Sequence, residues 1–393
     1  MKTILYVHHV SDVGGGSYCL LNILKEIDMK LYRPIVLLKK EGPLSIEIKK
    51  LNIPVYFMET LATVPYNVSL FRLGSIKGLF SILLSIKPFA RLLDELQPDL
   101  IHLNNMMLYP YLRIAKKKGV KTLIHVREHW ELGEHQTQRN MAIDYIDKYS
   151  DKVIAINEYS ASMVRNGNVE IIYDWIDFCG RDKYLSMSEL LQEDAKNLRV
   201  YLFTGGLQPI KGTLEIITLF SKYCNSANDR LLMLGVDMQR ISDKHDSCVR
   251  KILSRMGYKF YVYKVLDALK KDRRIKCVPA TYQIKHIMKQ SYCLVSYFTK
   301  PHANLALAES IILQVPAIAA DTPEAVEYSG GGKLAILFDM NSEEDFVCKL
   351  KMLQTYRNSL LEILEKNSCQ VEHLFSKQQN VQRLCNVYSE ILS

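Results

Sequence analysis

The chain has 393 residues, which is more than one hydrophobic core usually supports, so two domains are expected. Hydrophobic residues make up 48% and charged residues 24%, a composition that excludes disordered and fibrous proteins. The formal net charge of +9 suits a nucleotide diphosphate, an anionic membrane surface or a nucleic acid. A solvated basic surface without a specific partner explains it equally well.

Nine cysteines are spread along the chain, and none forms a C-x-x-C pair. An odd number in this pattern indicates neither a zinc site nor a disulfide framework, and it favours free thiols in a reducing compartment. The first residues enter a strand pattern directly, without the features of a signal peptide. No apolar stretch reaches the roughly 18 residues that a membrane-spanning helix needs. The sequence therefore predicts a cytoplasmic protein.

In the first half, short apolar runs rich in Ile, Val and Leu alternate with longer helical patterns. Such runs are typical of parallel strands that are buried on both faces. The predicted strands are Thr3–Val10, Arg33–Lys39, Val55–Phe57, Leu100–Leu103, Lys121–Val126 and Lys152–Ile156. The predicted helices are Ser17–Ile27, Pro43–Leu51, Ile76–Leu96, Tyr109–Lys118, Gln136–Tyr149 and Ser160–Asn166. This alternation predicts a doubly wound α/β sheet.

The pattern weakens across residues 178–197 and then restarts. The predicted strands of the second half are Leu198–Phe203, Leu231–Leu234, Ile275–Val278, Cys293–Ser296, Pro316–Ala320 and Ala335–Phe338. We therefore expect one Rossmann-like domain over residues 1–179 and a second over 180–375. A last helix, 376–393, has no strand after it, so it could return to the first domain.

The first motif with a possible role in binding is Gly14-Gly15-Gly16-Ser17, which follows the first strand and opens a helix. Glycines let a backbone approach a ligand closely and adopt positive φ, and a helix N-terminus offers free N–H groups to an anion. The motif does not match G-x-G-x-x-G, so a dinucleotide fingerprint is absent. A tight strand-to-helix turn without a ligand is the alternative interpretation.

The second motif is Gly205-Gly206-Leu207-Gln208-Pro209-Ile210-Lys211-Gly212, directly after the first strand of the second half. A lysine at the entry to a helix, beside free N–H groups, can hold a diphosphate and stabilise a leaving nucleotide. The alternative is a surface lysine in a capped turn.

The third motif is Lys300-Pro301-His302-Ala303-Asn304-Leu305-Ala306-Leu307-Ala308-Glu309, followed by an apolar strand that ends at Asp321. It places Glu309 on a helix among apolar neighbours. A carboxylate in such surroundings is costly to bury without a partner, and the hydroxyls of a ribose would supply one.

Together these motifs resemble the retaining glycosyltransferases of family four, whose fold is GT-B, over nearly the whole chain. Gly15-Gly16 match the glycines after the family's first strand, and Gly205-Gly206-Leu207…Lys211-Gly212 match its G-R-L…K-G segment. Glu309 with Val315-Pro316-Ala317-Ile318-Ala319-Ala320-Asp321 matches its donor-site segment. Asp99-Leu100-Ile101-His102-Leu103-Asn104 and Ser150-Asp151-Lys152-Val153-Ile154-Ala155-Ile156-Asn157 also resemble family segments.

The resemblance implies two Rossmann-like domains that face a central cleft, with the acceptor on the first and the donor on the second. Lys211 would hold the donor diphosphate, Glu309 the ribose, and His125 would stand beside the transferred sugar. These three are the expected catalytic residues. The expected donor-binding residues are Gly15, Gly16, Gly206, Lys211, His302, Asn304, Leu305 and Glu309.

Two positions depart from the family pattern. Gly206 stands where the family usually has an arginine, and Pro301 stands where the first of a pair of glutamates would be. Both changes remove groups that bind the transferring part of the donor. Arg127, His302 or Lys300 are candidates to replace them.

The segment Ser69–Arg91 interleaves apolar residues, among them Phe80 and Leu83, with Arg72, Lys77, Lys87 and Arg91. Such a basic amphipathic helix can lie on an anionic membrane. We favour the other interpretation, a helix whose apolar side packs on the sheet. His102 and His129 are expected to pack or lie at the surface, while His8-His9 could line the cleft.

The resemblance implies a retaining transfer of a sugar from a UDP- or GDP-sugar to a saccharide or lipid-linked saccharide, in the synthesis of cell-surface polysaccharide or glycan. No cofactor or metal is expected, because a lysine and helix N-termini can hold a diphosphate. The acceptor loops are expected at Glu59–Ser75 and Glu128–Arg139. The protein would be cytoplasmic or peripheral at the inner face of the membrane.

Other functions stay open. Gly206 and Pro301 motivate a non-catalytic subunit that binds a nucleotide-sugar or acts as a scaffold in a glycan assembly complex. A sugar epimerase of the same fold would need acidic residues in the cleft that the sequence does not place. Nucleic-acid binding is not expected, because the basic residues are dispersed and no recognition motif is present.

Overall fold

The computed structural model describes residues 1–12, 14–64, 73–128, 130, 136–165, 167–176, 185–239, 261–281 and 283–393. The side chains of 73–77 are not described. The chain divides into two compact units, and each is presented by itself. Unit 1 contains Met1–Trp175 and Ser376–Ser393, and unit 2 contains Ile176–Phe375. The predicted boundary at 179/180 and His129 lie outside the described residues.

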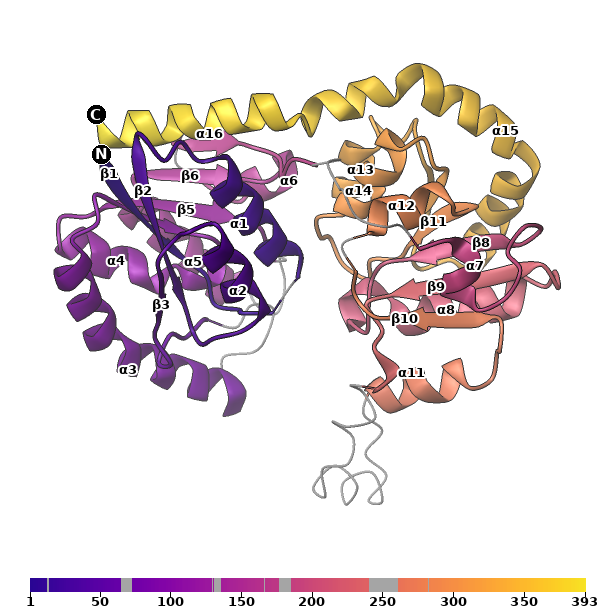
Figure 1. The fold of residues 1–393 in the computed structure, drawn as a ribbon, viewed down its shortest axis with the longest axis horizontal. Coiled ribbons are helices and arrows are strands. Elements are labelled where there is room, and N and C mark those ends of the chain that lie inside the picture. The colour runs from indigo at the N-terminus through magenta and orange to yellow at the C-terminus, as the bar shows by residue number, and fades with distance from the viewer. Residues whose placement is uncertain are drawn as a thin grey trace. The chain divides into compact units, whose positions relative to one another are not determined.

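Unit 1 is built on a parallel sheet of seven strands in the order β3-β2-β1-β4-β5-β6-β7 (Figure 1). Its strands are β1 (Lys2–Val7), β2 (Tyr32–Leu38), β3 (Val55–Phe57), β4 (Leu100–Leu103), β5 (Lys121–Val126), β6 (Lys152–Ala155) and β7 (Val169–Ile171). Its helices are α1 (Gly15–Glu26), α2 (Pro43–Lys50), α3 (Leu73–Leu96), η1 (Met106–Leu108), α4 (Pro110–Lys117), α5 (Gln136–Tyr149), α6 (Glu158–Ala161) and α16 (Lys377–Leu392).

Helices cover both faces of this sheet, so the central strands are buried on both sides. Residues of α3, α4 and α5 pack with alternate strand residues such as Leu5 and Ile101 in one core. The residues between them, such as Ile4 and Leu100, pack with α1, α2 and α16 in a second core. This double burial explains why apolar residues occur on both faces of the strands rather than at alternate positions only.

Unit 2 repeats the plan with a parallel sheet of six strands in the order β10-β9-β8-β11-β12-β13. Its strands are β8 (Arg199–Phe203), β9 (Asp229–Leu234), β10 (Ile275–Val278), β11 (Cys293–Ser296), β12 (Ala317–Ala320) and β13 (Ile336–Phe338). Its helices are α7 (Met187–Leu191), η2 (Pro209–Lys211), α8 (Thr213–Tyr223), α11 (Tyr261–Leu269), α12 (Ile284–Lys289), α13 (Leu305–Ile312), α14 (Pro323–Tyr328) and α15 (Glu343–Leu374). The α/β prediction is therefore confirmed.

Several predicted bounds differ from the structure, and three differences concern the ends or existence of whole elements in unit 1. The first strand ends at Val7 rather than Val10, because the side chains of His8 and His9 bond to polar groups beyond the sheet. The predicted helix Ser160–Asn166 is α6, which begins earlier, because the side chain of Asn157 caps it at Ser160 N, and ends at Ala161. Strand β7 was not predicted, since its three residues are only partly buried.

Helix α3 carries two apolar sides, and the sequence interpretation accounts for one of them. Ile82, Phe89 and Leu93 pack into the core of unit 1, as the favoured interpretation requires. Leu79, Phe80, Leu83 and Leu84 are instead 40%, 60%, 64% and 55% exposed. The favoured interpretation is therefore incomplete, because an apolar stripe of this helix faces solvent.

Helix α16 belongs to unit 1, although unit 2 precedes it in the sequence. Its residue Tyr388 is 1% exposed, and its hydroxyl lies 2.9 Å from the hydroxyl of Tyr6 and 2.9 Å from Nδ1 of His102. One hydroxyl proton can serve only one of the two, so Tyr388 donates to one partner and accepts from the other. This contact joins α16 to β1 and β4.

We predict that Tyr388→Phe lowers the free energy of unfolding by roughly 1–3 kcal/mol, because two buried polar groups lose their partner. The measurement is urea unfolding, followed by circular dichroism. Tyr32→Phe is the matched control, because the Tyr32 hydroxyl has only a long contact of 3.4 Å, to Ser389. Equal losses in the two variants would contradict the prediction.

Candidate functional site

Both sheets have a switch point where the direction of winding reverses. In unit 1 it lies between β1 and β4, and in unit 2 it lies between β8 and β11. Ligands of open α/β sheets bind outside the carboxyl ends of the strands at such points. Each predicted glycine motif follows the first strand of its unit, so each lies at a switch point.

In unit 1, Gly14 is the N-cap of the twelve-residue α1, and no side chain caps this helix end. Gly15 and Gly16 begin the helix, and a Cβ on Gly15 would meet no atom within 4 Å. None of the three glycines adopts the positive φ that we expected of them. Their contribution is instead an open backbone, whose N–H groups can face an anion.

Asn104, just after β4, holds this glycine loop in place. Its Nδ2 donates to the carbonyl oxygen of Gly16 at 3.1 Å and to Nδ1 of His8 at 3.1 Å, and its Oδ1 accepts from Arg127 Nε at 3.3 Å. Since Nδ1 of His8 accepts, the ring proton is on Nε2, which lies 3.1 Å from Ser17 Oγ. Burial also lowers the pKa of His8 well below 6.5, so His8 is neutral.

His125 lies at the end of β5 and is 2% exposed. Its Nδ1 accepts from Arg127 at 3.2 Å, so its proton is on Nε2. Burial first, and then the charge of Arg127, lowers the pKa of His125 well below 6.5. Within the described part of the chain, Nε2 of His125 has no hydrogen-bond partner. His125 is therefore a neutral hydrogen-bond donor with a free N–H, as a ligand-binding group would be.

Arg127 does not replace the missing arginine of Gly206. Its guanidinium pairs with the carboxylate of Asp174 and is 7% exposed. The pair neutralises the charge, and the remaining N–H groups position His125 and Asn104.

In unit 2, two left-handed glycines bracket the turn that carries Lys211. Gly206 has φ +60° and Gly212 has φ +65°. The hydroxyl of Thr213 donates to Gly206 O at 2.9 Å and fastens the turn. A Cβ on Gly206 would lie 3.2 Å from Gly235 O, a tight contact, and the positive φ of Gly206 adds strain for the family's arginine.

Lys211 ends η2, and its ammonium lies 4.7 Å from the ring centroid of Phe298. Among the described residues no carboxylate forms an ion pair with it. Burial lowers the pKa of Lys211 to about 8. The turn is tied to the segment after β11, because Thr299 N donates to Ile210 O at 3.0 Å. Lys211 is thus a cation held at the switch point without a counter-charge.

The same segment leads to α13. Asn304 is 3% exposed, caps this helix by accepting from Leu307 N at 3.3 Å, and donates to Ser296 Oγ at 3.0 Å. Leu305 is the first residue of α13. The side chain of Asn304 therefore positions α13, and the backbone of Leu305 forms the N-terminal end of this helix.

His302 precedes this cap and contacts the ring of Phe298, with centroids 5.4 Å apart. Burial, and then the charge of Lys211, lowers the pKa of His302 to about 4. Because it is neutral, His302 does not supply the charge of the missing arginine either. The structure thus brings Lys211, Phe298 and His302 together.

Glu309 is 6% exposed on α13. Burial raises its pKa to about 7, and the only charge that opposes this shift is that of Lys285 on α12. Glu309 therefore lies on a helix among buried apolar residues, as the sequence pattern predicted.

Two further carboxylates were missed from the sequence. Glu324 on α14 is 1% exposed, its Oε2 has no partner among the described residues, and burial raises its pKa to about 7. The backbone N–H of His302 bonds to it, so Glu324 holds the loop that contains Pro301. Glu128 accepts from Met106 N at 3.0 Å, and burial raises its pKa to about 7. Each lies within a few residues of the end of a strand, and this position in the sequence could have indicated them as site residues.

Some predicted features lie partly outside the described residues. The acceptor loops 59–75 and 128–139 fall largely outside the described residues. No cluster of three or more His, Cys, Asp and Glu side chains with metal-binding geometry occurs in the part of the chain that the structure describes. Within the same residues, no helix is both long and apolar enough to span a membrane.

Solved structures share this architecture over the full chain. A structure of HepE from Anabaena in complex with UDP-glucose has a TM-score of 0.76 at 17% identity, covering 99% of this chain and 100% of that chain. A glycosyltransferase from Rickettsia africae has a TM-score of 0.71 at 17% identity, covering 100% and 99%. Sucrose-phosphate synthase from Thermosynechococcus elongatus has a TM-score of 0.68 at 12% identity, with the same coverage. No curated protein sequence matches the chain.

The two doubly wound units and these structures define a fold of the GT-B type. Residues 13–178 match the family model described as Glycosyltransferase Family 4. This match bears out the resemblance to family four over residues 13–178.

We predict that Glu309→Gln raises the thermal midpoint at pH 8 and leaves it nearly unchanged at pH 4.5. The folded protein binds the Glu309 proton more tightly than the unfolded chain does, since the pKa rises from 4.5 to about 7. This group therefore destabilises the fold increasingly as pH rises from 4.5 through 7. Exposed Glu344→Gln is the control, and an equal gain in that variant would reject the assignment.

Proposed function

We propose that the protein transfers a sugar from a nucleotide-sugar to a saccharide or lipid-linked saccharide with retention of the anomeric configuration. The observation that carries this proposal is the uncompensated Lys211 ammonium, held at the unit 2 switch point beside the loop that leads to α13. A diphosphate supplies the missing negative charge. A UDP-sugar is the first candidate donor, because the HepE structure contains UDP-glucose.

In this proposal unit 2 binds the nucleotide. Lys211 and the N-terminal N–H groups of α13 meet the diphosphate and stabilise the negative charge that develops on it as the glycosidic bond breaks. The ribose hydroxyls donate to Glu309, whose buried carboxylate then has a partner. No metal is required in this scheme, because these groups hold the diphosphate directly.

Unit 1 serves the sugar and the acceptor. Gly15 and Gly16 offer open backbone at the uncapped end of α1, and the free Nε2–H of His125 donates to a sugar hydroxyl. Because His125 is neutral and cannot readily take up a second proton, it orients the sugar and does not act as a general acid. The acceptor hydroxyl attacks an oxocarbenium-like sugar from the face that the diphosphate leaves, so no protein nucleophile is needed.

We predict that Lys211→Met weakens UDP binding by at least 10-fold and lowers transfer by orders of magnitude, with the fold intact by circular dichroism. In the unaltered protein, UDP affinity should fall as pH rises through about 8, because the ammonium of Lys211 loses its proton there. This pH dependence should be absent from the variant. Calorimetric titration with UDP checks both points.

Lys222→Met is the matched control, because Lys222 is also on the α8 side of unit 2 but already pairs with Glu343 at 2.6 Å. If Lys211→Met bound UDP as tightly as this control does, the assignment of Lys211 would fall.

Two observations support a second candidate, a non-catalytic nucleotide-sugar-binding subunit of a glycan assembly complex. Gly206 supplies no side chain where the family has an arginine, and Pro301 offers no carboxylate. A folded protein that binds UDP but cleaves no UDP- or GDP-sugar in a panel, with or without acceptors, would favour this function. Hydrolysis or transfer of any one donor would reject it.

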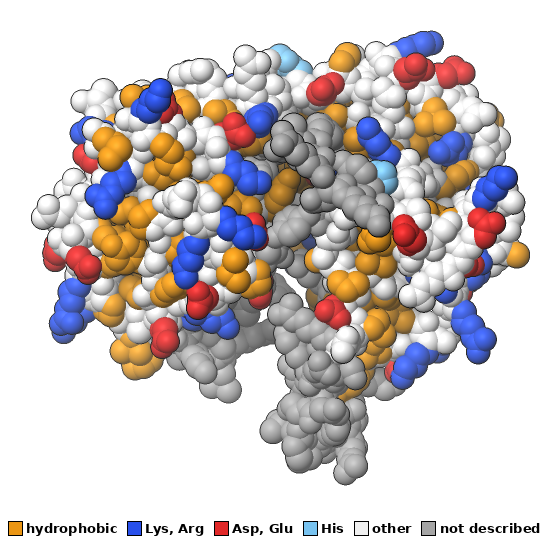
Figure 2. Space-filling model, in the orientation of Figure 1, with side chains coloured by type: hydrophobic (Ala, Val, Ile, Leu, Met, Phe, Trp, Pro, Cys, Tyr) orange, Lys and Arg blue, Asp and Glu red, His pale blue; other side chains and the backbone are white. Residues whose placement is uncertain are grey.

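We also propose that α3 docks unit 1 on an anionic lipid surface. The exposed stripe continues from Phe80 and Leu84 to Lys87 and Arg91, which are exposed as well, so apolar and basic groups share one side of the helix. Anionic headgroups complement the two charges, and lipid chains would cover the apolar residues. On the face shown in Figure 2, Lys and Arg side chains are interspersed with Asp and Glu side chains.

We predict that Leu83→Glu reduces co-sedimentation with vesicles of phosphatidylglycerol and phosphatidylcholine by at least 5-fold, because a carboxylate replaces an apolar contact beside the basic groups. Ile46→Glu is the control, since Ile46 is 52% exposed on α2, outside the stripe. Binding of unaltered protein that is no stronger than that of Leu83→Glu would rule out the docking surface.

A further inference from the structure

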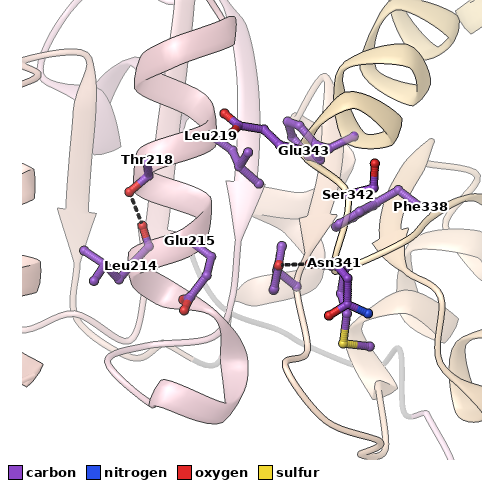
Figure 3. Close-up of a pocket in the computed structure, with 11 residues that line it drawn as sticks. Leu214, Glu215, Thr218, Leu219, Phe338, Asn341, Ser342 and Glu343 are labelled. Atoms are coloured by element: carbon purple, nitrogen blue, oxygen red, sulfur yellow. Dashed lines mark hydrogen bonds between the residues drawn. The ribbon is translucent and has the colours of Figure 1, made fainter.

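Unit 2 contains a pocket of about 360 Å³ that the donor site does not use (Figure 3). It lies between α8 and the segment that joins β13 to α15. Its apolar walls come from Leu214, Leu219, Tyr297, Phe338, Met340 and Phe346, and its polar residues are Glu215, Thr218, Asn341, Ser342 and Glu343. A largely apolar cavity of this size with a few polar groups is typical of sites for small organic ligands.

Most polar groups of the pocket already have partners. Thr218 donates to Leu214 O at 2.8 Å, Ser342 accepts from Asp345 N at 3.1 Å, and Asn341 donates to Asp339. Glu343 accepts from Lys222 at 2.6 Å and from Tyr223 at 2.5 Å. Each of these residues therefore already has a partner within unit 2.

Glu215 is the exception. Its Oε2 is buried and has no hydrogen-bond partner among the described residues. Glu215 and Tyr297 both line the pocket. Of the described residues that line the pocket, none is basic. An unpaired carboxylate among apolar side chains favours a cation that carries an apolar body.

The pocket shares one wall with the donor turn. Tyr297 donates to Met340 O at 2.5 Å on the pocket side. On its other side it abuts Gly212, where an added Cβ would lie 2.4 Å from the ring. The next residue, Phe298, supports the ammonium of Lys211. A ligand that orders Tyr297 therefore also orders the backbone that presents Lys211.

We propose that this pocket binds a small organic cation with an apolar body, through Glu215, and that its occupancy strengthens diphosphate binding at Lys211. The first part stands on the pocket alone. The second part rests on the proposed function, because it assumes that Lys211 binds a diphosphate. By linkage, a cation that tightens UDP binding is itself bound more tightly when UDP is present.

The test uses three probes that share one apolar body: 2-phenylethylammonium, 2-phenylethanol and phenylacetate. Binding to the full chain is measured by ligand-observed NMR without UDP. We expect the cation to bind at least 5-fold more tightly than the alcohol and the anion to bind most weakly. Glu215→Gln should remove the preference for the cation, and Glu344→Gln, outside the pocket, should retain it. Equal affinities of the cation and the alcohol would overturn the site.

Thr218→Trp tests the location independently, because the exposed Thr218 tolerates a larger side chain that fills the pocket. This variant should lose all three probes while its thermal midpoint is retained, and unchanged binding would overturn the assignment to this pocket. UDP is then titrated with and without saturating cation. We expect at least a 3-fold gain in UDP affinity, which Thr218→Trp abolishes. An unchanged UDP affinity would overturn the coupling, and absence of any UDP binding would instead refute the donor site and leave the cation site in place.

Discussion

The turn between Gly205 and Gly212 must bring a lysine to the carboxyl end of β8 while the backbone returns to start α8. Two left-handed residues make this reversal possible, and glycine adopts this conformation without strain. At Gly212 a Cβ would also lie 2.4 Å from the ring of Tyr297. Thr213 and Thr299 then fasten the turn to the backbone on each side. The ammonium of Lys211 is left facing an aromatic ring instead of a carboxylate, and this unbalanced charge is what a diphosphate would satisfy.

In unit 1, amide, imidazole and guanidinium groups form a hydrogen-bonded network at the switch point. Asn104 donates through Nδ2 to Gly16 and His8 and accepts through Oδ1 from Arg127, and this fixes the protonation of His8. Arg127 in turn fixes that of His125. The consequence is a set of neutral, oriented polar groups around the end of α1. Buried polar networks of this kind are rigid when they are satisfied, and here one N–H, that of His125, is left for a ligand.

Much of this architecture could be predicted from the sequence. Strands buried on both faces are mostly apolar on both, so Leu100–Leu103, Lys121–Val126 and Cys293–Ser296 were predicted with the bounds that they have in the structure. Glycine turns after the first strand of each unit marked the switch points. The tertiary partners could not be predicted, because Glu324 reaches His302 and Asp174 reaches Arg127 only after folding. The exposure of Leu83 was missed for a similar reason, since both sides of α3 are apolar and sequence periodicity does not say which side the core covers.

The packing of α16 constrains the order in which the chain can mature. Residues 176–375 form a contiguous unit, and the ribosome completes them before it makes α16. Until α16 emerges, Tyr6 and His102 lack the hydroxyl of Tyr388, and the apolar surface that Leu384, Val387 and Ile391 later cover is open. The unit that is translated first is thus finished last, and nascent chains must keep this surface from aggregating throughout the synthesis of unit 2.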